Sequence, residues 1–218
     1  MGSSSLRRTR IPGNGQRFRE LSDLSTNGFS LSDVDERTVG GLCDGYPFDG
    51  QSAYSGLIEY SEDAMWGGGR EIELEFQFRD QSNLFILDAE VDLPSVESVI
   101  QRLNSLSSDD VKIYRSLTVH RERLWDFLNN ADKIIDLTLI GDQGTEISFE
   151  ELDSELHEPE FEIEQYPIES ATVVFSYEGE QILTRYTDGA LSVHSDVSEA
   201  TEYLVQLFER DVIADSGD

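Results

Sequence analysis

The sequence predicts an α+β fold, in which an antiparallel sheet or sheets are covered mainly on one face by about three helices. In several segments after residue 70, apolar residues alternate with polar ones, the pattern of strands with one solvated face. Two of these segments end in a two-residue loop whose second residue is Gly, which is typical of antiparallel hairpins. Apolar residues at helical spacing interrupt the strands, and such helices must cover the apolar face of a sheet.

Glycine content and charge divide the chain into four expected parts. Residues 1–20 hold five arginines against one glutamate and are expected to form a flexible basic arm. Residues 21–69 are rich in Gly, Ser and Asp and end in a glycine triplet, so we expect an irregular segment. An α+β domain follows at residues 70–213, before an acidic tail at 214–218. If that domain comprises two subunits, the acidic connector near residues 150–160 is the expected boundary.

The first half of this domain is predicted as a hairpin, a helix and a third strand. Apolar residues alternate from Ile72 to Phe78 and again from Phe85, which predicts a hairpin over residues 71–92. Pro94 suits the first turn of a helix, and an apolar stripe at helical spacing follows it. Apolar alternation over residues 111–119 predicts the third strand.

The second half is predicted to end in a β-meander and a helix. A helix around Leu128 and a strand up to Gly141 precede the acidic connector. Three short strands follow, separated by turns at Glu178–Gly179 and Asp188–Gly189. Asp196 then has Glu199 three residues on, which is the spacing of a capping box at the start of the last helix.

The charge of the chain points to its environment. The 218 residues contain 45 acidic and 16 basic side chains, for a formal net charge of −29, and the basic residues are 14 Arg and 2 Lys. Such a charge destabilises a compact state by self-repulsion in dilute buffer, whereas at 1 M salt the screening length falls to about 3 Å. This acid-rich, lysine-poor composition resembles that of proteins from halophilic archaea. A protein that mimics DNA is the alternative explanation, but it would not account for the loss of Lys alone.

Composition also bears on location and redox chemistry. No apolar run approaches the ~20 residues of a membrane span, and no secretory signal is visible, so a cytoplasmic location is expected. Cys43 is the single cysteine. We therefore expect a free, partly buried thiol and no internal disulfide.

Motifs for catalysis, metal binding or cofactor binding are absent from the sequence. The three histidines are scattered, there is no Gly-x-Ser-x-Gly elbow, and no glycine-rich loop leads to Lys and Ser or Thr. Pairs of carboxylates carry little information, because 45 of 218 residues are acidic. We expect no metal and no cofactor. If the protein is an enzyme, its site is dispersed, and strand residues such as Asp88, Glu90 or Asp136 would serve.

One stretch departs from the acidic pattern. Residues 112–123 contain four basic side chains and one acid, and Arg115 falls on the apolar side of its predicted strand, where a lone charge is costly unless paired. Ion pairs with the abundant carboxylates are one explanation, and a contact surface for a partner or an anion is the other. The candidate contact residues are Lys112, Arg115, His120, Arg121, Arg123 and Trp125.

These observations favour a non-enzymatic interaction or regulatory module of a salt-adapted cytoplasm, with a protein as partner. An enzyme with a dispersed acidic site is the first alternative. The second is a protein associated with nucleic acid through the arginine arm and residues 112–123, although the overall negative field opposes this. The sequence leaves open whether the protein forms a homo-oligomer, and no membrane association is expected.

Overall fold

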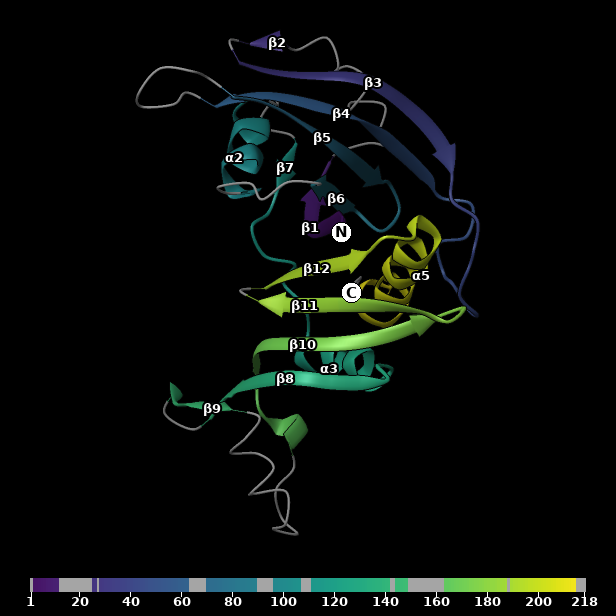
Figure 1. The fold of residues 1–218 in the computed structure, drawn as a ribbon, viewed down its shortest axis with the longest axis vertical. Coiled ribbons are helices and arrows are strands. Elements are labelled where there is room, and N and C mark those ends of the chain that lie inside the picture. The colour runs from purple at the N-terminus through teal and green to yellow at the C-terminus, as the bar shows by residue number, and fades with distance from the viewer. Residues whose placement is uncertain are drawn as a thin grey trace. The chain divides into compact units, whose positions relative to one another are not determined.

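The computed structural model describes residues 2–11, 25–26, 28–62, 70–89, 96–106, 111–141, 144–148, 163–187 and 189–214. The chain forms two compact units. Unit 1 comprises Met1–Gly41 and Phe48–Leu117, and unit 2 comprises Leu42–Pro47 and Thr118–Asp218. Each unit combines antiparallel strands with at least one helix, and the predicted α+β class is confirmed (Figure 1).

Unit 1 is built on one antiparallel sheet with the strand order β2-β3-β4-β5-β6-β1, and β7 pairs with the end of β1. The predicted hairpin is present as β5 and β6. The elements of unit 1 are β1 (Gly2–Arg10), β2 (Ser25–Thr26), β3 (Phe29–Thr38), β4 (Ser52–Glu62), β5 (Arg70–Arg79), β6 (Leu84–Ala89), α2 (Val96–Leu106) and β7 (Lys112–Ile113).

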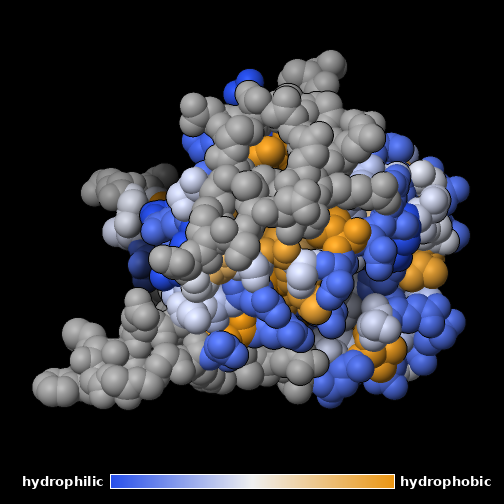
Figure 2. All heavy atoms as spheres, turned by 90° about the horizontal axis from the view of Figure 1, so that it is seen from above, coloured by the Kyte–Doolittle hydropathy of each residue, from blue (hydrophilic) through white to orange (hydrophobic). Residues whose placement is uncertain are grey.

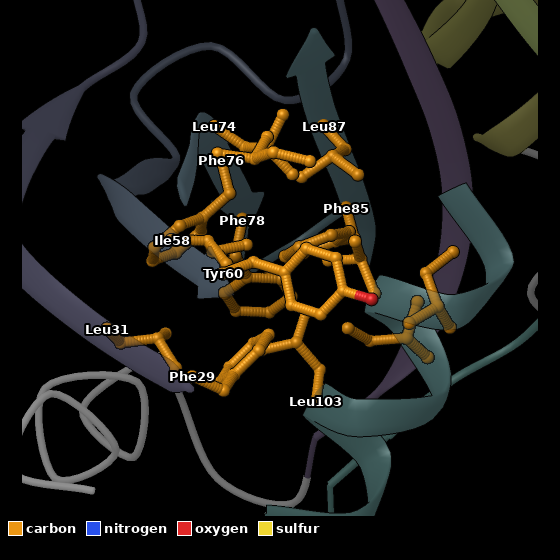
Figure 3. Packing of buried hydrophobic residues seen from close by; sticks show 14 of the residues in the cluster. Phe29, Leu31, Ile58, Tyr60, Leu74, Phe76, Phe78, Phe85, Leu87 and Leu103 are labelled. Atoms are coloured by element: carbon orange, nitrogen blue, oxygen red, sulfur yellow. The ribbon is translucent and has the colours of Figure 1, made fainter. Parts of the chain in front are cut away.

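The core of unit 1 follows from the alternation in β5. Leu74 and Phe76 are buried, whereas the glutamates between the apolar positions of this strand are exposed. The apolar stripe of α2 packs into the same cluster, where Figure 3 shows Leu103 close to Tyr60 and Phe29. Burial of one large apolar side chain stabilises a fold by about 1.5–3 kcal/mol, so this cluster holds the helix on the sheet.

The arginine-rich N-terminus differs from the flexible arm expected over residues 1–20. Residues 2–10 form β1, which pairs with β6 and buries Leu6 completely. The Arg7 guanidinium is buried and donates to Ser5 Oγ and Leu6 O, and Arg8 donates to Ser82 O. These two arginines are therefore engaged in the fold of unit 1. Residues 12–20 lie outside the described residues.

The segment over residues 21–69, expected to be irregular, contains the two long strands β3 and β4. Their apolar residues do alternate, as at Phe29 and Leu31, but Ser, Gly and Asp between them obscure the pattern in the sequence. A register shift in β3 interrupts it further. The glycine triplet at 67–69 lies outside the described residues.

Unit 2 has the strand order β12-β11-β10-β8-β9, again antiparallel. The predicted C-terminal β-meander followed by a helix is confirmed (Figure 1). The elements are α3 (Arg121–Asn129), β8 (Lys133–Ile140), β9 (Glu146–Ser148), the 3₁₀ helix η2 (Ile163–Gln165), β10 (Ile168–Tyr177), β11 (Glu180–Thr187), β12 (Ala190–Ser195), α5 (Ser198–Phe208) and the π-helix η3 (Glu209–Ile213).

Three aromatic side chains form the centre of unit 2. The ring of Phe127 in α3 lies 5.0 Å from that of Phe175 in β10 and 5.3 Å from that of Phe208 in α5. Both helices therefore cover the same face of this sheet. The start of α5 differs from the capping box predicted at Asp196, because the N-cap position is taken by Val197, whose side chain makes no capping hydrogen bond.

The division between the units lies elsewhere than expected. The strands on the two sides of the 150–160 connector, β8 and β10, are neighbours in one sheet, with Leu137 opposite Ala171. The chain instead passes from unit 1 to unit 2 after Leu117, within the segment predicted as the third strand. Of that strand only β7 forms. Residues 150–160 and 215–218 lie outside the described residues.

On the face shown in Figure 2, several hydrophobic side chains lie near the centre, with hydrophilic ones beside and below them. Among the described residues, none of the helices is long and apolar enough to cross a membrane.

Candidate functional site

The stretch predicted as a basic contact surface is divided between the two units. Lys112 and Arg115 belong to unit 1, whereas His120, Arg121 and Arg123 belong to unit 2. The sequence prediction treated all of them as one patch because they are close in the chain. The structure groups only the last three.

In unit 1, Lys112 and Arg115 each lie beside a partner in the same unit. The Lys112 ammonium lies 5.3 Å from the centre of the Tyr114 ring, within reach of a cation–π interaction. Arg115 was expected on the apolar side of a strand, but it is exposed and follows the two-residue β7. Its Nε lies 3.8 Å from Glu97 Oε2, a long exposed ion pair of little energetic weight.

In unit 2, the N-terminal end of α3 borders a depression of about 540 Å³. His120 occupies the N-cap position of the helix, and its side chain accepts no capping hydrogen bond. The depression is lined by His120, Arg121, Glu122, Arg123 and Pro167.

One side of α3 holds residues 165–167, the wall segment, of which Pro167 lines the depression. Arg121 Nη1 donates to Gln165 O, and Trp125 Nε1, one turn later, donates to Tyr166 O at 3.4 Å. Residues four apart lie on the same helix face, which explains why these two side chains reach consecutive carbonyls. Trp125 is buried, so it acts as an anchor of the wall and not as the surface contact that the sequence predicted.

Charged side chains of both signs line the depression, with Arg121 and Arg123 beside Glu122. Arginine side chains in the first turn of a helix are repelled by the positive end of the helix dipole, and a bound anion reduces this repulsion. Arg121 is exposed, and within the part of the chain that the structure describes its hydrogen-bond partner is a carbonyl, which does not neutralise its charge. Arg123 Nη1 lies 3.8 Å from Asp126 Oδ2 in a partly exposed pair.

A second hollow, in unit 1, was not predicted. It has a volume of about 250 Å³ and lies at the register shift in β3, opposite β4. Asp33 and Val34 both face Gly56 at the bulge, and Asp33 has a φ of 52°. The hollow is lined by Asp33, Asp35, Ser55, Gly56, Leu57, Glu75, Phe76, Gln77 and Asp88.

Asp88 is the unusual side chain of this hollow. It lies directly opposite Glu75 across the β5–β6 ladder, and like charges in that position repel. Its Oδ1 is buried and has no hydrogen-bond partner among the described residues. Burial raises the pKa of Asp88 and Glu75 adds to that rise, whereas the Ser4 hydroxyl and the charge of Arg79 oppose it.

The sequence offered no signal for this hollow. Asp88 was one of several strand acids available to a dispersed site, but the bulge that brings Asp33 and Asp35 toward it cannot be recognised in a chain so rich in acids. Among the described residues, no group of three or more His, Cys, Asp or Glu side chains could hold a metal ion.

No protein-family model matches this chain, and a search of curated proteins finds no match. The function is therefore argued from the geometry of the two hollows.

Proposed function

We propose that the protein is a non-enzymatic interaction module of a salt-adapted cytoplasm, and that it binds a carboxylate-bearing segment of a protein partner at the depression beside α3. The observation that supports this most is the placement of Arg121 and Arg123 around a hollow of about 540 Å³ in a chain of net charge −29. A basic hollow on so acidic a chain selects a negatively charged ligand.

Arginine suits a carboxylate partner in particular. Its planar guanidinium can donate two parallel hydrogen bonds to the two oxygens of a carboxylate, which adds geometric selectivity to attraction between charges. That selectivity matters at molar salt, where screening removes most of the long-range attraction. Pro167 contributes an apolar wall to the same hollow.

The acidic composition supports the environment named in the proposal. The chain contains two Lys and 14 Arg. A need for negative charge alone does not explain why Lys is so much rarer than Arg. Arg7 and Arg8 do not support the alternative that the protein binds nucleic acid, because both guanidinium groups donate hydrogen bonds within unit 1.

The test is a comparison of variants in molar KCl. The tagged protein, its Arg121→Ala/Arg123→Ala double variant and a control variant, Arg185→Ala, are used to capture proteins from a lysate of the source organism. Arg185 is an exposed arginine on β11 of the same unit. We expect one protein to be retained by the wild type and the control and lost by the double variant.

Equal capture by all three forms, capture of nucleic acid, or capture of a second copy of the chain alone would each overturn the proposal. Circular dichroism of the double variant ensures that a loss of binding is not a loss of fold. This control matters because Arg121 also donates to the wall at Gln165.

A second candidate function, an enzyme with a dispersed acidic site, is favoured by one observation: the partnerless oxygen of Asp88 in the hollow of unit 1. Asp88 lies opposite the carboxylate of Glu75, and pairs of carboxylates in unlike surroundings are the usual groups of acid–base catalysis. A panel of p-nitrophenyl glycosides, esters and phosphates tests it. Turnover that Asp88→Asn abolishes and Glu73→Gln leaves intact would support an enzyme, since Glu73 is an exposed glutamate on the same strand as Glu75.

A further inference from the structure

Residues 42–47 lie in the connection between β3 and β4 of unit 1, yet they belong to unit 2. The base of this connection is closed within unit 1, where Val39 N donates to Gln51 O and Gly50 N donates to Val39 O, both at 2.9 Å. The chain leaves unit 1 after Gly41 and returns at Phe48. We call residues 42–47 the tip.

Polar contacts to the C-terminal helices hold the tip. Leu42 N donates to Gln206 Oε1 at 2.6 Å, and the Tyr46 hydroxyl donates to Glu209 Oε2 at 2.5 Å. Arg210 Nη1 donates to Asp44 O at 3.2 Å. The side chains of Gln206 and Glu209 are fully buried, so the tip satisfies polar groups that water does not reach.

Besides these hydrogen bonds, the tip buries few apolar side chains. Cys43 and Tyr46 are buried, whereas Asp44, Gly45 and Pro47 are exposed. A segment with few buried apolar contacts opens at a lower free energy than a core strand or helix. Opening would also return the Glu209 carboxylate to water, which offsets part of the lost contacts.

From this arrangement we infer that the tip is a latch that opens and closes while both units stay folded, held closed mainly by the hydrogen bond from Tyr46 to Glu209.

Cys43 provides the readout, since it is the single cysteine and lies buried in the tip. Burial raises the pKa of the Cys43 thiol. The charge of Arg210 lowers this pKa by a smaller amount, and the nearby carboxylates of Asp211 and Glu209 raise it. The closed state therefore holds little thiolate and reacts slowly. N-ethylmaleimide is the suitable reagent, because a neutral molecule is not repelled by the acidic chain. Under native conditions the rate of modification then measures the open population.

The experiment compares the full-length wild type with Tyr46→Phe and Tyr54→Phe. Tyr54 is a buried tyrosine of unit 1 whose hydroxyl donates to Glu36 Oε1 at 3.3 Å, so the control variant also removes a tyrosine–glutamate hydrogen bond. We expect Tyr46→Phe to raise the rate of Cys43 modification by about tenfold or more, because the variant loses a hydrogen bond to the Glu209 carboxylate that stabilises the closed state. Tyr54→Phe should leave the rate unchanged.

Equal effects of the two variants, or no effect of either, would overturn the latch. So would a wild-type Cys43 that reacts only as fast as the whole protein unfolds in denaturant. Hydrogen exchange of the Leu42 amide in the wild type gives a second measurement that needs no variant. We expect its opening free energy to match that from Cys43 and to lie below that of the β10 amides, and equal values for Leu42 and β10 would contradict the proposal.

Discussion

Asp88 has a carboxylate oxygen that is buried without a hydrogen-bond partner among the described residues, opposite a second carboxylate in the ladder. A buried unsatisfied polar group costs about 1–3 kcal/mol, and more when it is charged. Asp88 therefore lowers the stability of unit 1 whenever it is ionised. Destabilised polar groups of this kind are found at sites used for binding or catalysis, where activity is retained at the expense of stability.

Replacing Asp88 by Asn tests this cost. Because the pKa of Asp88 is raised in the folded protein, its favourable contribution to stability is present below the pKa of the unfolded chain and is lost as the pH rises through the folded pKa. Asp88→Asn avoids that loss. We expect the variant to be more stable than the wild type by about 1 kcal/mol at pH 7, with the difference shrinking toward low pH.

Urea unfolding at several pH values measures the effect. Asp80→Asn is a control, since Asp80 lies at the turn after β5 and outside the hollow. A variant that is less stable than the wild type at neutral pH would show that Asp88 is compensated by its surroundings.

Single residues of the candidate site were only partly predictable from the sequence. The sequence singles out Arg121 and Arg123, because a cluster of positive charge is conspicuous in an acidic chain, and in the structure both are among the residues that line the depression beside α3. The sequence could not show that Trp125 turns inward to hold Tyr166, or that the unit boundary separates Arg115 from the others. Both depend on the packing of segments far apart in the chain.

At the scale of elements, the bulge in β3 shapes the hollow of unit 1. Gly56 faces this bulge, and a Cβ added there would lie 2.8 Å from Ser32 O and 3.0 Å from the Phe76 ring. The close approach of the β3 backbone therefore requires glycine at this position.

Gly56→Ala is expected to destabilise the protein by about 1–3 kcal/mol, the usual cost of inserting a methyl group into packed structure. Gly40→Ala is the matched control, because a Cβ at Gly40 meets nothing within 4 Å and the backbone there is not in the left-handed region. Thermal unfolding of both variants decides the matter. If the two alanines cost the same, the bulge is not held against Gly56 as described.

Elements with strong periodicity were predicted well, and those with local irregularity were not. The hairpin of β5 and β6 and the meander of β10, β11 and β12 show clean alternation and tight turns, and they formed as expected. The strand β3 was missed because its bulge shifts the alternation midway. The strand β1 was missed because Leu6 stands among serines and arginines, so that only its pairing with β6 reveals it.

At the scale of the whole molecule, the charge of −29 predicts a dependence on salt. Raising KCl from 0.1 M to 1 M shortens the screening length from about 10 Å to about 3 Å and so weakens repulsion across the chain. We expect the free energy of unfolding to rise steadily over a KCl titration. Sucrose at equal osmolality provides the control, because it strengthens folding without screening charge.

Full stability at low salt would remove the support for a salt-adapted environment. It would leave the charge to be explained by a basic partner, as in the mimicry of DNA. A rise that sucrose reproduces in full would likewise show that charge repulsion is not the cause.

The proposed binding site is tested most directly by hydrogen exchange of the complex with the captured partner in molar KCl, read along the chain by mass spectrometry. We predict that binding slows exchange at the first turn of α3 and at residues 165–167, and leaves β3 and β4 unchanged. Protection confined to β3 and β4, at the hollow that contains Asp88, would contradict the account and place the interaction in unit 1.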